Sequence, residues 1–290
     1  MRYRIDLSYD GAPFCGWQIQ PGSPSVQETL EKALGTLLRS TVGVVGAGRT
    51  DTGVHALGYV AHFDFDGEVP PALLCPAGLD CNQLRYKLNA ILPQGIAVQG
   101  IKPVSDEFHA RFSAVKRSYS YFLHRCKDPF MEGRSYFYAY PDVDFDAMNR
   151  AARSLLGTHD FSCFEKSGGD NKTSVCTVYS AEWVPYEPVM PGPSNVMPGS
   201  TGHLYWRFNI TADRFLRNMV RAIVGTLLEV GRGRRTVKDF DALVLPVQEM
   251  PDQVGHDEGR HCRLDRQSMR PNAGESAPGH ALYLTSVEYE

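Results

Sequence analysis

The sequence predicts an α+β protein made of two similar halves, each a mostly antiparallel sheet with helices on one face. Short segments in which apolar and polar residues alternate predict strands, and segments with apolar residues at helical spacing predict the helices between them. Elements of both kinds occur in residues 1–104 and again in residues 105–290. We therefore expect two domains, divided after residue 104.

In the first half, the predicted elements follow the order β-α-β-β-α-β. The first helix, residues 25–39, begins at a capping-box pattern formed by Ser25 and Glu28 and continues with leucines at helical spacing. The second helix ends before Pro93, because the residue that precedes a proline disfavours helical geometry. The other predicted bounds are strands at residues 1–9, 42–45, 59–65 and 96–103 and a helix at residues 81–92.

In the second half, strands are predicted at residues 118–123, 172–184, 203–211 and 281–289 and helices at residues 146–156 and 215–230. The last helix has an apolar face, and Arg217 and Arg221, four residues apart, share the edge of that face. The connections near residues 185–202 and 246–276 are rich in proline, glycine or polar residues, so we expect flexible insertions without a core of their own.

Composition excludes several classes of protein. The 290 residues are 42% hydrophobic and 22% charged, as in ordinary globular proteins. The first residues lack the apolar core of a signal peptide, and no uncharged apolar run approaches the length of a membrane span, so we expect a cytoplasmic protein. The net charge of −3 argues against a protein that coats nucleic acid nonspecifically, but residues 212–238 hold seven basic and two acidic residues. Such a local patch is compatible with one phosphate-rich ligand.

The cysteines do not predict a disulfide framework or a structural zinc site. There are seven of them, scattered and never in a CxxC pair, so reduced thiols are expected. The nearest approach to a metal-binding pattern is His256 with His261 and Cys262, in a polar and loop-like segment. We expect no metal there.

A glycine-punctuated turn at residues 46–56 combines a carboxylate, an arginine and a histidine between two predicted strands. Glycines at positions 46, 48 and 53 let such a loop hold reactive side chains close to a ligand. Considered alone, Asp51 could instead be a turn residue that bonds only to the backbone. A dinucleotide-binding turn is disfavoured, because the glycine order is GxxGxG rather than GxGxxG and no Walker lysine follows.

Five motifs in order resemble those of the TruA family of tRNA pseudouridine synthases, and the resemblance covers nearly the whole chain. They lie at residues 9–20, 48–56, 109–121, 157–164 and 219–231. The departures are Thr52, the final motif at residues 277–284 and a longer connection at residues 185–202, and none removes a reactive group. The resemblance implies the pseudouridine synthase fold, with an active-site cleft between the two halves.

The resemblance also implies the reaction and the partners. Uridine would be isomerised to pseudouridine at positions 38 to 40 in the anticodon stem-loop of tRNA, by a homodimer that needs no cofactor. Asp51 is the expected nucleophile, toward either the sugar or the base. Tyr119 would stack on the base or transfer a proton, and Arg221 would keep the carboxylate ionised.

The remaining expected contacts are with RNA. Arg49 would enter the base stack as the target nucleotide leaves it, and His55 would contact RNA or, as we prefer, brace the loop. Further RNA contacts are expected at Trp17, Gln18, Arg214 and Arg217.

Two alternatives stay open at this point. One is a noncatalytic RNA-binding or tRNA-chaperone module that keeps the cleft without turnover. The other is a metal-dependent hydrolase that uses His55, His62 and Asp51.

Overall fold

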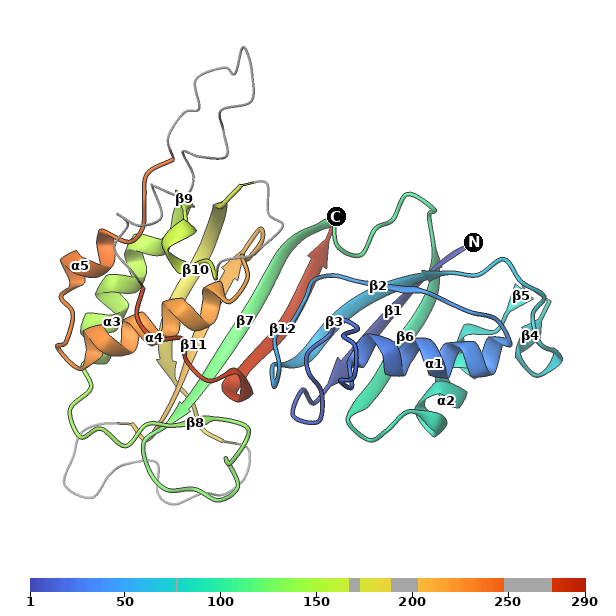
Figure 1. The fold of residues 1–290 in the computed structure, drawn as a ribbon, viewed down its shortest axis with the longest axis horizontal. Helices are drawn as coiled ribbons and strands as arrows, with labels where there is room; N and C mark the ends of the chain where they lie inside the picture. The colour runs from blue at the N-terminus through green and yellow to red at the C-terminus, as the bar shows by residue number, and fades with distance from the viewer. Residues whose placement is uncertain (77, 167–172, 189–202, 248–272) are drawn as a thin grey trace, which may run out of the picture. The chain divides into compact units, whose positions relative to one another are not determined.

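The computed structural model describes residues 1–76, 78–166, 173–188, 203–247 and 273–290. These residues form a mixed α+β structure with a large, mostly antiparallel sheet and few helices, which confirms that part of the predicted fold class (Figure 1). Most of the two expected insertions, near 185–202 and 246–276, lies outside the described residues. None of the described helices has the length and apolar character that a membrane span requires.

The chain separates into two compact units. The first comprises residues 1–139, 185–207 and 278–290, and the second comprises residues 140–184 and 208–277. The last strand of the chain therefore completes the unit that the first strand begins. A repeat of similar halves with a boundary after residue 104 stays a prediction.

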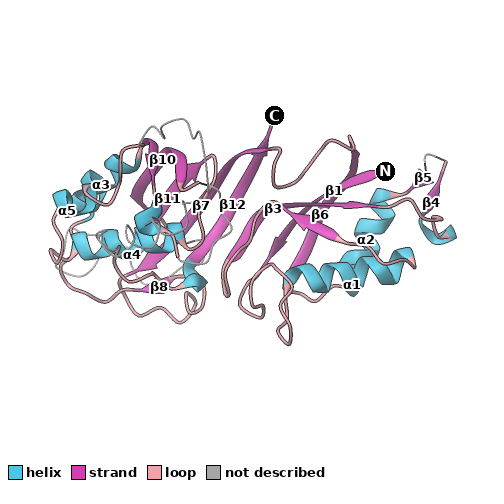
Figure 2. Ribbon diagram, turned by 45° about the horizontal axis from the view of Figure 1, so that its top comes forward, coloured by secondary structure: helices cyan, strands magenta, loops and turns pink. Residues whose placement is uncertain are grey.

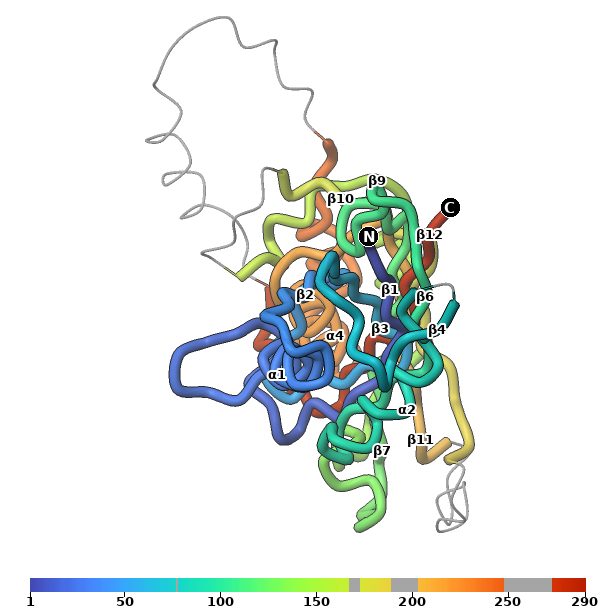
Figure 3. Tube along the Cα trace, turned by 90° about the vertical axis from the view of Figure 1, so that its right-hand side faces the viewer, coloured from blue at the N-terminus to red at the C-terminus, as the bar shows by residue number. Residues whose placement is uncertain are grey.

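In the first unit, five long strands lie in the order β6-β1-β3-β12-β7, with the bounds Ile96–Val104, Arg2–Tyr9, His55–Asp64, Leu282–Tyr289 and Ala114–His124. β1 is antiparallel to β3 and β6, next to which it lies in Figures 1 and 3. β12 is antiparallel to β7 but parallel to β3, where Tyr283 lies opposite His55. Shorter strands pair at the margins: β2 (Val44–Gly46) with β3, β8 (Tyr136–Phe137) with β7, and β4 (Leu74–Cys75) with β5 (Gly78–Leu79).

Two helices, α1 (Val26–Leu38) and α2 (Cys81–Ile91), complete this unit (Figure 2). The Ser25 hydroxyl accepts a hydrogen bond from the Glu28 N–H at 3.2 Å, as the sequence predicts for the start of α1. Leu30 and Leu34 of α1 share one hydrophobic core with Ile5 and Leu7 of β1. Alternate residues of β1 are buried, so its alternating sequence pattern correctly predicts which face the core covers.

The second unit holds β9 (Gly157–Asp160), most of β10 (Val175–Pro185) and β11 (Tyr205–Ala212), and helices α3 (Phe145–Ala152), α4 (Met219–Gly231) and α5 (Val237–Asp241). β9 and β10 are antiparallel, and α3 packs against both α4 and α5. The 3-10 turns of the two units are Pro71–Leu73, Arg153–Leu155, Ser162–Phe164 and Gly279–Ala281. All the expected strands and helices have a counterpart among the described elements.

Candidate active site

The loop that carries Asp51 joins β2 to β3, as predicted, and β3 holds it in place. The Ala47 N–H donates to the Val60 carbonyl oxygen at 2.8 Å, and the Tyr59 hydroxyl donates to the Gly48 carbonyl oxygen at 2.5 Å. The Tyr59 ring stacks on Trp17, with 4.2 Å between the ring centroids. These bonds fix the loop immediately before its reactive residues.

Thr50 is held by two other segments of the first unit. Its hydroxyl lies 2.9 Å from the Tyr9 hydroxyl, and its carbonyl oxygen accepts the Trp17 N–H at 3.2 Å. This approach requires Gly16, because a Cβ there would lie 2.3 Å from the Thr50 carbonyl oxygen and the residue has a φ of +87°.

Asp51 is half-buried and starts a tight turn. Its carbonyl oxygen accepts the Val54 N–H at 3.1 Å, and Gly53 within the turn has a φ of +76°. Bonds therefore restrain the backbone on both sides of the carboxylate, which is the condition for a pre-organised reactive group.

Tyr119 lies on β7, opposite Leu284 of β12, and packs partly buried against the core of the first unit. Burial raises the pKa of the Tyr119 phenol to about 12; the charge of Arg117 opposes this rise and that of Asp51 adds to it. The structure thus brings Asp51 and Tyr119 within electrostatic reach. At neutral pH the phenol is therefore protonated and has a proton to donate.

Arg117 is a residue of this site that sequence reasoning did not single out. Its Nη2 donates to the carbonyl oxygens of Arg111 at 2.6 Å and Ala47 at 3.4 Å, and its Nη1 donates to Ala114 at 3.0 Å. The guanidinium thereby joins the turn before β7 to the first residue of the Asp51 loop. The sequence feature that points to Arg117 is its position two residues before Tyr119, since residues two apart on a strand place their side chains on the same face.

Arg221 lies on α4 in the second unit and makes two hydrogen bonds with Ala277, one as donor and one as acceptor. Its Nε donates to the Ala277 carbonyl oxygen at 2.8 Å, and its own carbonyl oxygen accepts the Ala277 N–H at 3.0 Å. One turn later, a Cβ on Gly225 would lie 1.8 Å from the Glu275 carbonyl oxygen, so this glycine permits the close approach. The guanidinium is therefore oriented by its Nε, while its association with Asp51 stays a prediction.

Comparison with known proteins identifies the family. A family model described as tRNA pseudouridine synthase matches residues 151–254. The tRNA pseudouridine synthase A of Bacteroides fragilis is 44% identical over 289 residues, which cover 99% of this chain and 96% of the relative. The chain belongs to the tRNA pseudouridine synthase A family.

Two further relatives carry the same name. The protein of Porphyromonas gingivalis is 43% identical over 288 residues, covering 99% of this chain and 97% of its own, and that of Bacillus subtilis is 38% identical over 293 residues, covering all of both chains. These similarities confirm the family resemblance that the five sequence motifs indicated.

Within this member of the pseudouridine synthase family, His55 is buried and held on three sides. Its Nδ1 accepts the Gly11 N–H at 3.1 Å, its Nε2 lies 2.9 Å from the His280 carbonyl oxygen, and its ring stacks on Tyr283 at 4.5 Å. Nδ1 also lies 3.0 Å from an Asp10 carboxylate oxygen. This geometry favours a bracing role for His55 over an RNA contact.

The other residues expected to contact RNA differ in exposure. Arg49 and Arg217 are exposed, and Gln18 is half-buried. Arg214 is also half-buried, with its Nη2 donating to the Thr173 carbonyl oxygen at 2.6 Å. Trp17, with 3% of its surface exposed, lies within the core, so its ring supports the Asp51 loop rather than facing the surface.

In the part of the chain that the structure describes, no group of three or more histidines, cysteines or carboxylates could hold a metal ion. The set of His55, His62 and Asp51 required by the hydrolase alternative is not assembled there, and the His62 Nδ1 instead accepts the Ala110 N–H at 3.1 Å. His256, His261 and Cys262 lie outside the described residues.

Proposed function

We propose that this enzyme isomerises uridine to pseudouridine at positions 38 to 40 in the anticodon stem-loop of tRNA, with Asp51 as the nucleophile. Family membership over the full length of the chain supports isomerisation on tRNA. The observation that carries the residue assignment is a half-buried aspartate on a restrained loop, within electrostatic reach of a protonated tyrosine.

The reaction breaks the bond between the sugar and a ring nitrogen and forms one between the sugar and a ring carbon, which then loses its proton. Asp51 would attack the sugar or the base, and either route requires an ionised carboxylate. Arg221 would favour that ionised form by its positive charge. The neutral phenol of Tyr119 would lie against the rotating base and donate or pass on a proton.

RNA recognition would begin with removal of the target nucleotide from its stack. Extrusion costs a few kcal/mol, and a planar guanidinium can offset part of that cost by filling the gap. Arg49 is exposed and lies two residues before Asp51, so it is the side chain suited to this role. We further propose a cytoplasmic homodimer, with the exposed Arg217 among its contacts to phosphate.

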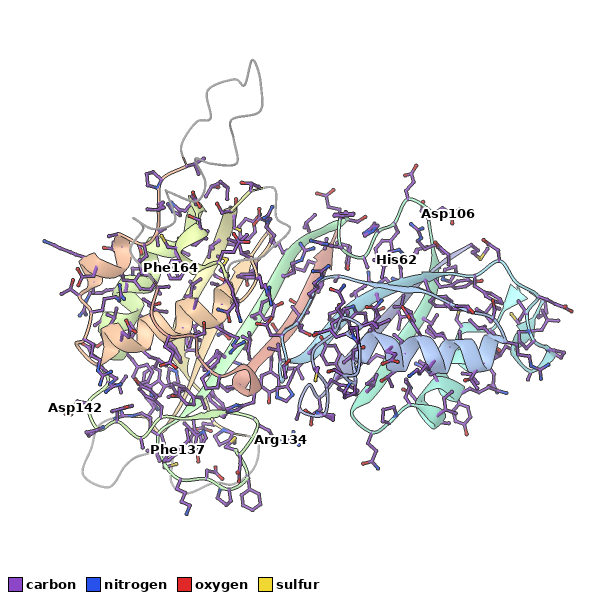
Figure 4. All side chains as sticks on the ribbon, in the orientation of Figure 1. His62, Asp106, Arg134, Phe137, Asp142 and Phe164 are labelled. Carbon is purple, nitrogen blue, oxygen red and sulfur yellow. The ribbon has the colours of Figure 1, made fainter. Side chains whose placement is uncertain are left out.

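Pseudouridine mapping of anticodon stem-loop RNA, in the presence of chelator, tests the proposal. We expect wild type to convert one or more of positions 38 to 40 and Asp51→Asn to be slower by more than about 1,000-fold, because a nucleophile is lost. Asp106→Asn is the matched control, since Asp106 is an exposed carboxylate of the same unit (Figure 4), and it should react at the wild-type rate.

Two results would contradict the proposal. An Asp51→Asn variant with the wild-type rate would remove Asp51 from the mechanism. A wild-type protein that binds the RNA and leaves every uridine unchanged would favour the noncatalytic RNA-binding alternative.

A further inference from the structure

The turn at residues 109–113, which precedes β7, presents the most exposed aromatic side chain among the described residues. Phe112 has 75% of its surface exposed. We propose that Phe112 and Arg111 form a stacking site for an unpaired nucleobase of the RNA substrate, distinct from the site of the reacting uridine. This inference rests on the proposed function and names a second contact with the same substrate.

A single exposed phenylalanine is common, but this one is held in a rigid turn. The His109 Nδ1 accepts the N–H groups of Arg111 at 3.1 Å and Phe112 at 3.2 Å, and the His109 ring lies against Phe112 with 4.3 Å between centroids. Ser113 closes the turn, since its N–H donates to the His109 carbonyl oxygen at 2.9 Å. Burial lowers the pKa of His109, which favours the neutral ring that an acceptor role of Nδ1 requires.

The turn is also anchored to the sheet through Ala110. The Ala110 N–H donates to the His62 Nδ1 at 3.1 Å on β3, and its carbonyl oxygen accepts the Tyr289 hydroxyl at 2.7 Å on β12. The backbone that carries the exposed ring is therefore held in place before any ligand arrives. Pre-organisation reduces the entropy lost on binding, which favours a recognition role for the ring.

The charge beside the ring indicates which ligand it fits. The exposed guanidinium of Arg111 lies 5.6 Å from the centroid of the Phe112 ring, a distance typical of a cation–π pair. An aromatic ring with an adjacent arginine can stack on any unpaired base while the cation attracts the neighbouring phosphate. The acidic residues of the same loop, Asp106 and Glu107, come earlier in the chain.

The connection to the catalytic loop is direct. Nη2 of Arg117 bonds to the carbonyl oxygen of Arg111, and the same nitrogen bonds to that of Ala47, two residues before Arg49. The turn that carries Phe112 and the loop that carries Asp51 thus belong to one unit and share a hydrogen-bonding partner. The base that we expect to stack on Phe112 is therefore a base other than the target uridine.

Fluorescence of 2-aminopurine, placed in turn at each unpaired position of an anticodon stem-loop, tests the inference. The protein is Asp51→Ala, so that the readout needs no turnover. We expect binding to quench the probe at one position through stacking on Phe112. Phe112→Leu, which keeps an apolar side chain without a π face, should restore the fluorescence and weaken binding roughly 5- to 100-fold, and Phe112→Trp should retain both properties.

Phe130→Leu is the matched control, because Phe130 belongs to the same unit and is 65% exposed, with carboxylates at positions 128 and 132. It should leave quenching and affinity unchanged. The inference fails if no position is quenched, if the two leucine variants behave alike, or if sedimentation shows that Phe112→Leu separates a dimer, which would assign the ring to a contact between copies of this chain.

Failure of the inference and failure of the proposed function give different results. A wild-type protein that forms pseudouridine without any Phe112-dependent quenching removes only the stacking site. Quenching in the absence of pseudouridine from wild type removes only the catalytic proposal.

Discussion

The hydroxyl groups of Tyr9 and Thr50 lie 2.9 Å apart in the interior, and Thr50 immediately precedes Asp51. Tyr9→Phe removes this hydrogen bond and leaves the Thr50 hydroxyl buried, so we expect the free energy of unfolding to fall by about 1–2 kcal/mol. Because the bond positions the loop, kcat for pseudouridine formation should fall several-fold with little change in KM. Denaturant unfolding and steady-state kinetics measure the two effects.

The control for this variant is Tyr3→Phe. Tyr3 is a buried tyrosine of the same strand, but its ring stacks on Phe63 of β3, outside the Asp51 loop. Its replacement should leave kcat unchanged. Equal losses of kcat in the two variants would show that Tyr9 contributes only to the core.

A second prediction concerns the glycine that lies against the Asp51 loop. Gly16→Ala places a methyl group 2.3 Å from the Thr50 carbonyl oxygen in a backbone with a φ of +87°, so the loop must move. We expect a loss of about 2–4 kcal/mol in the free energy of unfolding, measured in urea, together with reduced activity. Gly22→Ala is matched for backbone strain, with a φ of +73° and no atom within 4 Å of its Cβ, and should cost only about 1 kcal/mol.

The sequence predicts those parts of the fold that depend on local pattern. Ser25 and Glu28 correctly mark the start of α1, and alternation correctly marks β1. The prediction that α4 starts at residue 215 is wrong by four residues, because Asn218 adopts a φ of +65° and the helix begins at Met219. α5 is not among the predicted elements, although Thr236 and Asp239 form a capping box that marks its start.

Side-chain environment was harder to predict than the elements, because it depends on partners distant in sequence. The motif around Trp17 suggested an RNA contact, but its ring stacks on Tyr59, forty-two positions later, and is buried. The link that Arg117 makes between residues 47 and 111 likewise requires three segments to be placed in space. Local periodicity contains no such information.

A third prediction follows from the burial of His62 on β3. Burial, with a smaller contribution from Arg2, lowers the pKa of His62 to about 4. In the unfolded chain the pKa is about 6.5, so between pH 6.5 and 4 the unfolded state binds more protons. The contribution of His62 to the free energy of unfolding is therefore complete above pH 6.5. As the pH falls toward 4, the free energy of unfolding decreases by on the order of 2–4 kcal/mol.

His62→Asn isolates this contribution, since an amide oxygen can still accept the Ala110 N–H but does not titrate. The difference in unfolding free energy between wild type and variant, measured in urea from pH 7 to 4.5, should shrink or reverse as the pH falls. Other histidines, such as His124 and His280, also have a lowered pKa, but they are present in both proteins and cancel in the difference. A difference independent of pH would contradict the prediction.

The final prediction separates the charge of Arg221 from its orientation. Arg221→Lys keeps a cation on α4. An arginine can donate from its Nε to the Ala277 carbonyl oxygen and still present its other N–H donors in a fixed plane, whereas a lysine cannot do both. If the guanidinium serves the reaction, kcat should fall roughly 10- to 100-fold, whereas loss of one hydrogen bond should change the free energy of unfolding by only about 1 kcal/mol. Arg217→Lys, at an exposed position four residues earlier, provides the control and should leave kcat within about twofold. Single-turnover rates at saturating RNA make the comparison independent of binding, so an Arg221→Lys enzyme with normal turnover and lower stability would limit Arg221 to holding α4 against residue 277.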